Sequence, residues 1–130
     1  MQLDFDKWNH NVNIGKSIDL TNADFSIVLE KFNQLDQKQF TQIILGGDND
    51  HLIVGGGKGN YVCTFSTNNN DEFYNLINKA ASENEDIDIV TGGQEGTFPA
   101  TIVVGEDAAL NALKYYFENQ KMNPDLTWEE

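Results

Sequence analysis

The chain contains no arginine. All eight of its basic residues are lysines, against 21 aspartates and glutamates, which gives a formal net charge of −13 over 130 residues. Arginine is the side chain that binds phosphates and carboxylates through two parallel hydrogen bonds, so its absence disfavours nucleic-acid binding and phosphate-clamping enzymes. An acidic chain of this kind favours basic partners instead.

Cysteine and histidine are scarce. The chain has one cysteine, Cys63, and two histidines, His10 and His51. A single cysteine excludes an internal disulfide and fits a reducing compartment. These three residues are scattered along the chain, so they offer neither a zinc site nor a nucleophile with its base. The sequence therefore predicts a protein that is not an enzyme and that has no metal and no cofactor.

Long apolar runs are also missing. No segment approaches the roughly eighteen apolar residues that a membrane span needs, and the start at Met1 lacks the pattern of a signal peptide. We therefore expect a cytoplasmic protein. The hydrophobic content of 39%, with fourteen aromatic residues, predicts a folded chain. This length fits one domain, residues 1–130, that buries about two thirds of its unfolded surface.

Glycine clusters punctuate the middle of the chain. The segment Gly55–Asn60 contains GGGKG but lacks the upstream glycine and the following serine or threonine of a phosphate-binding loop. Residues 46–50 include Asp48-Asn49-Asp50, but these residues are not followed by the glycine and the distant glutamate that a calcium loop requires. Both segments, together with residues 68–71, are therefore predicted as turns between strands.

Two helices are expected. The first begins at Thr21, where Thr21–Asp24 has the form of a capping box, and runs to about Leu35 or Asp36. The second begins after Gly105 and places one apolar stripe on the core, formed by Ala109, Ala112, Leu113, Tyr116 and Phe117.

Between the helices the apolar period changes to two. The predicted strands are residues 40–45, 52–54, 61–66, a strand around Ile87 and Ile89, and residues 101–104. Tyr61, Cys63 and Phe65 should share one face of their strand. The pattern predicts an α+β fold: an antiparallel meandering sheet of about five or six strands with two helices packed on one face.

One window carries charge of a single sign. Residues 80–113 contain no lysine and seven carboxylates: Glu83, Glu85, Asp86, Asp88, Glu95, Glu106 and Asp107. Asp86 and Asp88 alternate with Ile87 and Ile89, so a strand there would bury the isoleucines and expose both carboxylates. The window is either an ordinary soluble face or a surface for a basic partner. On the second interpretation the candidate partner-binding residues are Glu83, Glu85, Asp86, Asp88 and Glu95.

The last forty residues carry a family resemblance. GGQEGTFPA at residues 92–100, followed by a strand, a helix ending in Tyr115-Tyr116-Phe117 and the tail NPDLTW at residues 123–128, resembles the immunity proteins of bacterial polymorphic toxin systems, in the family associated with deaminase-type toxins. Upstream the likeness is looser, and the first twenty residues add almost nothing. The family places a returning strand at about residues 72–77, where apolar residues also have helical spacing, and we therefore expect a strand there.

The resemblance implies a protein that binds and neutralises a cognate toxin, by covering the basic active-site region of a nucleic-acid deaminase. Phe98, Pro99 and Trp128 are expected to close the core rather than to contact the toxin. Trp8 is either a core residue or an interface anchor. Two alternatives remain: an acidic intracellular protein-interaction module unrelated to toxins, and a small hydrolase with paired carboxylates, which would need a deep pocket.

Overall fold

The computed structural model describes residues 1–47, 49–67 and 71–130, so the predicted turns at residues 46–50 and 68–71 lie partly outside the described residues. The described chain is α+β, as predicted. Its helices are α1 (Phe25–Gln34) and α2 (Glu106–Asn119), with a short 3-10 helix at Ala100–Ile102. Its strands are β1 (Gln2–Phe5), β2 (Trp8–Asn9), β3 (Val12–Asn13), β4 (Ser17–Asp19), β5 (Gln42–Gly46), β6 (Asp50–Gly57), β7 (Asn60–Thr67), β8 (Glu72–Leu76), β9 (Asp86–Thr91), β10 (Gln94–Pro99) and β11 (Trp128–Glu129).

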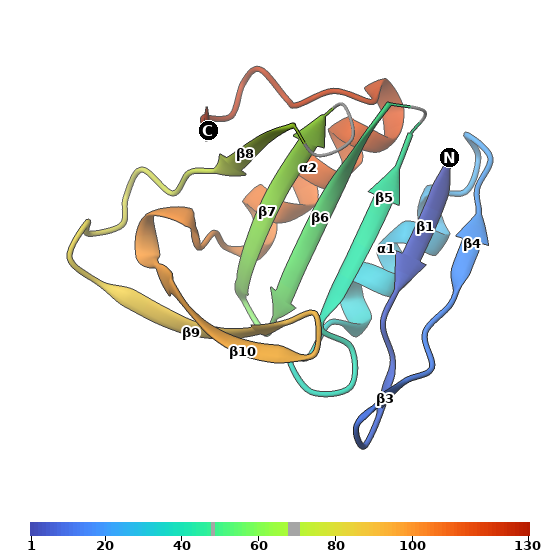
Figure 1. Cartoon of the computed structure of the whole chain (residues 1–130). Helices are drawn as coiled ribbons and strands as arrows, with labels where there is room; N and C mark the ends of the chain where they lie inside the picture. The colour runs from blue at the N-terminus through green and yellow to red at the C-terminus, as the bar shows by residue number, and fades with distance from the viewer. Residues whose placement is uncertain (48, 68–70) are drawn as a thin grey trace.

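Seven of these strands form one antiparallel sheet in the order β11-β8-β7-β6-β5-β1-β4. Strands β5 to β8 are the predicted meander, and strand β8 confirms the choice of a strand over a helix. Both helices pack behind this sheet, while the separate β9–β10 hairpin crosses one end of its front (Figure 1). The chain thus has three layers at that end and two layers elsewhere.

The main core lies between the sheet and the helices. Strand β7 turns Tyr61, Cys63 and Phe65 toward the helices, as its alternation predicts, and all three side chains are buried. The Tyr61 ring stacks on Phe32 of α1 with centroids 5.0 Å apart. Aromatic side chains of this size supply a large share of the apolar burial that stabilises a small domain.

Helix α2 follows its sequence pattern closely. Gly105 is its N-cap residue, and the five stripe residues predicted for it are all buried. The Tyr116 hydroxyl donates a hydrogen bond to the Asp50 carbonyl oxygen and accepts one from the Gly47 N–H, both at 3.0 Å. These bonds attach the helix to the β5–β6 connection. None of the described helices is long and apolar enough to cross a bilayer.

The predicted start of the first helix is wrong. Helix α1 begins at Phe25 rather than at Thr21. The Asp24 carboxylate accepts hydrogen bonds from the Thr21 N–H at 2.8 Å and the Thr21 hydroxyl at 3.0 Å. The capping-box residues therefore form a separate turn before the helix, which explains why the predicted start lies four residues before the observed one.

The glycine cluster at residues 55–60 is only partly a turn. Gly55, Gly56 and Gly57 belong to strand β6 and pair with β7, so the reversal is confined to Lys58 and Gly59. At Gly57, whose φ is 143°, a Cβ atom would lie 2.6 Å from the Leu35 carbonyl carbon and oxygen. Glycine here permits close contact between strand β6 and the end of α1.

Three further segments differ from expectation. Residues 101–104 form no strand: a 3-10 helix covers Ala100–Ile102, and Val104 makes a single β-bridge to Tyr61. The strand of this region is β10, inside the GGQEGTFPA motif itself. The first twenty residues, in which no strand was predicted, supply β1 to β4, and β1 lies inside the large sheet between β5 and β4.

Burial raises the pKa of the Cys63 thiol from 9.0 to about 12. In the unfolded chain the thiol ionises above about pH 9, whereas in the folded chain it keeps its proton up to about pH 12. This contribution to stability is therefore complete below about pH 9 and is lost as the pH rises toward 12. We predict that the free energy of unfolding falls across this range with a steeper slope than in Cys63→Ala, as measured by urea denaturation.

The same burial protects the thiol from reagents. Native protein should react with Ellman's reagent only as fast as the domain opens, and urea-unfolded protein should react at once. Native reaction at the rate of a small thiol would contradict the placement of Cys63.

Candidate functional site

The acidic window is built on the β9–β10 hairpin. Its two strands are joined by Gly92 and Gly93, with φ values of 64° and 78°. Thr91 pairs with Gln94 across this two-residue turn. Positive φ at both central residues is the geometry that matches the twist of a hairpin, and glycine adopts it without strain. The motif that carries the family resemblance therefore forms a hairpin turn and its outer strand.

The hairpin has an apolar face and an acidic face. Ile89 is fully buried and packs with Val62 of β7 and with Val103, while Ile87 and Phe98 pack at the margin of this second core. The apolar face therefore rests on the front of the large sheet. The prediction that Ile87 and Ile89 point inward is confirmed.

Asp86, Asp88 and Glu95 lie on the opposite, outward face. All three side chains are exposed. Residues directly opposite each other in an antiparallel pair share a face. Glu95 lies opposite Val90, which is on the same face of β9 as Asp86 and Asp88. The Thr97 hydroxyl donates a hydrogen bond of 2.7 Å to the Asp88 carboxylate.

Glu83 and Glu85 extend this acidic face into the loop that precedes β9. Both are exposed, and the Glu85 carbonyl oxygen accepts a hydrogen bond of 2.8 Å from the Ala100 N–H at the far end of β10. The structure thus brings all five predicted residues onto one element, the hairpin with its lead-in loop. We call this surface, Glu83, Glu85, Asp86, Asp88 and Glu95, the acidic hairpin surface.

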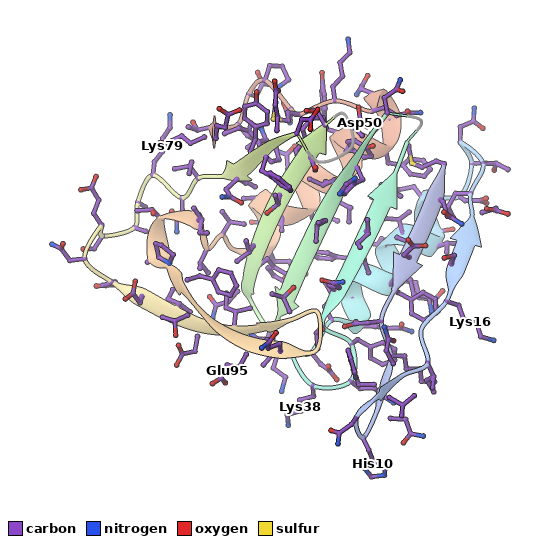
Figure 2. All side chains as sticks on the ribbon, viewed as in Figure 1. His10, Lys16, Lys38, Asp50, Lys79 and Glu95 are labelled. Carbon is purple, nitrogen blue, oxygen red and sulfur yellow. The ribbon has the colours of Figure 1, made fainter. Side chains whose placement is uncertain are left out.

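The structure also adds a positive charge that the sequence window does not contain. Lys38, from the loop between α1 and β5, lies at the same end of the molecule as Glu95 (Figure 2). Glu106 and Asp107 leave the hairpin altogether, since they form the first turn of α2. At the other end of the hairpin, Lys79 lines a hollow together with Glu83.

A buried carboxylate holds the turn of the hairpin. Asp6 is 3% exposed and accepts hydrogen bonds from the Thr41 N–H at 2.7 Å, the Gln42 N–H at 3.0 Å, the Trp8 indole N–H at 2.7 Å and the Thr41 hydroxyl. The Thr41 hydroxyl oxygen in turn accepts a hydrogen bond of 2.9 Å from the Gly93 N–H. Asp6 thus links the amino-terminal segment, the start of β5 and the hairpin turn.

Trp8 packs directly under that turn. A Cβ atom on Gly93 would lie 2.1 Å from the Trp8 ring, so the two residues are in close contact. Trp8 is partly buried. Of the two roles considered for Trp8, this packing supports the structural one.

Gln37 ties the body of the hairpin to the loop that follows α1. Its side-chain oxygen accepts a hydrogen bond of 3.0 Å from the Val90 N–H, and its side-chain nitrogen donates one of 2.9 Å to the Gly57 carbonyl oxygen. The adjacent Asp36 carboxylate accepts the N–H groups of residues 38–40. Burial raises the Asp36 pKa, but these hydrogen bonds and the nearby Lys58 outweigh it, and the pKa lies below its usual value.

Sequence reasoning missed Asp6, Thr41 and Gln37. The only local signal was Asp6 two residues before Trp8. The other partners of the Asp6 carboxylate, Thr41 and Gln42, lie more than thirty residues away along the chain. Such contacts follow from the tertiary fold and have no period or spacing in the sequence.

The three residues considered for metal or nucleophilic chemistry are separated. His10 lies at the tip of the β2–β3 hairpin, with a φ of 58°, at the lower end of the view in Figure 2. His51 lies on strand β6, and Cys63 is buried behind the sheet. Within residues 1–47, 49–67 and 71–130, no group of three or more histidine, cysteine, aspartate or glutamate side chains is placed to hold a metal ion.

Comparisons with known proteins add no relatives. No family model matches the chain, and no curated protein and no solved structure matches it. The resemblance to immunity proteins therefore rests on the quoted residues.

We predict that Asp6→Ala destabilises the protein by about 3 kcal/mol or more, because buried N–H groups of three residues lose their acceptor. The measurement is urea denaturation. Asp19→Ala on the neighbouring edge strand removes an exposed carboxylate and should change stability by less than about 0.5 kcal/mol. In a Trp128→Phe background, Asp6→Ala should also shift the Trp8 emission to the red. Equal urea midpoints for Asp6→Ala and Asp19→Ala would contradict the assigned role of Asp6.

Proposed function

We propose that this chain is an immunity protein that binds and neutralises a cognate bacterial toxin, a nucleic-acid deaminase, by covering its basic active-site region. The observation that carries the proposal is the acidic hairpin surface, which lies on the same hairpin as the GGQEGTFPA motif of the family resemblance and shares Glu95 with it. In this proposal the protein acts in the cytoplasm, is not an enzyme and needs no cofactor.

Charge supports a basic partner. In the described parts of the chain no strand contains a lysine, so every strand surface is either neutral or acidic. A deaminase that acts on nucleic acid must hold a polyanion beside its pocket, and its entrance is accordingly basic. An acidic protein competes for the same region, and long-range attraction accelerates the encounter.

Rigidity supports a role in binding as well. The hairpin is held by the second apolar core, by the Asp6 hydrogen bonds at its turn and by Gln37 along β9. A surface fixed in advance loses little conformational entropy when a partner binds. The backbone of β9 and β10, which carries Asp86, Asp88 and Glu95, is therefore held in place.

An acidic interaction module unrelated to toxins would present the same surface to a different basic protein. Coexpression separates the two functions. The chain is expressed with each toxin domain encoded in its own genome, and cell survival is scored. We expect rescue from one toxin, encoded beside this chain. If no toxin is neutralised, the interaction module becomes the better interpretation.

We predict that Asp86→Lys with Asp88→Lys slows association with that toxin by about tenfold or more while leaving the urea midpoint nearly unchanged, because both side chains are exposed. The rates are measured by surface plasmon resonance between 50 and about 500 mM salt. Association of the wild type should slow steeply with salt, because the Debye length falls to about 8 Å at physiological ionic strength.

The matched control is Glu30→Lys with Glu118→Lys, which makes the same change in net charge at exposed positions of α1 and α2. This control should change association far less than the hairpin variant. Equal slowing by the two variants would show that only net charge matters, and an association rate that ignores salt would count against electrostatic steering.

A further inference from the structure

The front of the large sheet is left uncovered beside the hairpin. The hairpin covers one row of residues on this face. Thr91 packs on Gly55 of β6, and Ile89 packs on Val62 of β7. Gly55 and Val62 are paired across these two strands. In Figure 1 no other helix or strand of the described residues lies over the rest of this face. The hairpin therefore forms a wall along one side of an open sheet surface.

One row of this open surface crosses all seven strands. Pairwise register places these residues in one line on the face away from the helices: Ser17, Asp4, Ile44, Ile53, Thr64, Asn75 and Glu129. The next row consists of Asp19, Gln2, Gly46, His51, Ser66 and Phe73, of which Ser66 is fully buried. We call these two rows the open sheet surface. Residues paired across neighbouring strands share a face, so both rows point to the front.

The open sheet surface is apolar at its centre. Ile44 and Ile53 are adjacent and partly exposed, and Phe73 is 47% exposed. The apolar side chains on the other face of the same strands, such as Leu45, are fully buried in the main core. An antiparallel sheet that faces water normally alternates to polar side chains on its exposed face, so two neighbouring isoleucines there depart from the usual pattern.

Carboxylates lie near both ends of the first row, with Asp4 next to Ser17 and Glu129 at the opposite end, and each of these carboxylates lines a hollow. The hollow at the β1 end has a volume of about 360 Å³ and is lined by Asp4, Ile44 and Asp50 among others. The hollow at the β8 end has a volume of about 420 Å³ and is lined by Asn75, Lys79, Glu83, Glu129 and Glu130 among others, so it contains three carboxylates and one lysine. Glu83 belongs to the acidic hairpin surface, so the two surfaces are continuous.

We infer that the open sheet surface receives a basic segment of the toxin, with an apolar side chain over Ile44 and Ile53 and basic side chains in the acidic hollows. This inference rests on the proposed function and extends it. Charge selects this occupant: the two rows contain three carboxylates, Asp4, Asp19 and Glu129, and no lysine. A second copy of the chain, with a net charge of −13, would be repelled.

The two surfaces should act on different rate constants. Exposed carboxylates of the hairpin set the association rate, whereas an apolar contact that loses its water on binding sets the dissociation rate. We therefore expect Ile44→Thr with Ile53→Thr to raise the dissociation rate about tenfold or more, with an unchanged association rate and salt dependence. Threonine keeps the β-branch that favours a strand, so the sheet should remain folded.

The matched control removes two other exposed apolar side chains. Val12 and Ile14, on and beside strand β3, are 61% and 45% exposed and lie outside the open sheet surface. Val12→Thr with Ile14→Thr should leave both rate constants within about twofold of the wild type. Ile53→Lys is a second test, since it places a positive charge at the centre of the surface and should weaken binding further.

The outcomes are distinguishable. If the wild type neutralises a toxin and Ile44→Thr with Ile53→Thr binds it like the wild type, the inference is overturned and the proposed function stands. A toxin complex that depends on Val12 and Ile14 instead also overturns the inference. A concentration-dependent dimer in sedimentation velocity that the isoleucine variant abolishes would make a second copy the occupant and would overturn it as well.

If the wild type neutralises no toxin, the proposed function fails and the surface is tested with a peptide probe. The probe is Lys-Lys-Leu-Leu-Lys-Lys, and the readout is the methyl NMR spectrum of the isotope-labelled protein. The largest shifts are expected at Ile44, Ile53 and Thr64, and a peptide of lysine alone should not produce them. Shifts centred on the hairpin, on Val12 and Ile14, or on no site at all would overturn the inference.

Discussion

The arrangement of the molecule depends on one buried carboxylate. A charge removed from water is tolerated only when hydrogen bonds replace its hydration, and Asp6 receives such bonds from Thr41, Gln42 and Trp8. Through Thr41 the same group reaches the Gly93 N–H. Three segments that are distant in the sequence therefore have fixed relative positions, and the direction in which the hairpin points follows from them.

This constraint gives the front of the sheet its two regions. The helices occupy the back, and the hairpin, held at its turn, covers only one end of the front. The covered end presents charge on a rigid hairpin, and the uncovered end presents two isoleucines between acidic hollows. Charge attracts a partner over a distance, and apolar contact retains it, so the two regions complement each other in the proposed complex.

Much of the fold was predictable because it follows from local patterns. Period-two alternation identified the strands of the meander, and the stripe that includes Ala109 and Tyr116 identified the buried face of α2. Local signals failed where tertiary contacts decide. Gly55 to Gly57 look like a turn but continue a strand, because β7 supplies partners for their backbone. Residues 101–104 look like a strand but have only one bridging partner, at Tyr61.

One part of the candidate site was likewise predictable from local sequence, and the other part was not. The five carboxylates of the acidic hairpin surface are close together in space because they are close in the sequence, so a count of charges along the chain was enough to find them. The first row of the open sheet surface takes one residue from each of seven strands, and only the register of the sheet brings Ile44 beside Ile53 and Asp4. No window of sequence contains it. The linkage through Asp6 is hidden for the same reason.

Gly55 offers a way to recognise relatives of this protein. A Cβ atom at this position would lie 1.9 Å from the Thr91 hydroxyl oxygen and 2.7 Å from the Thr91 Cβ, so the hairpin rests on bare backbone. Any homologous chain with a larger residue here must lift its hairpin off the sheet or shorten the residue that faces it. Two alignment columns that keep glycine at position 55 and threonine at position 91 would therefore mark relatives whose hairpin packs on the sheet in the same way, even where overall sequence identity is low.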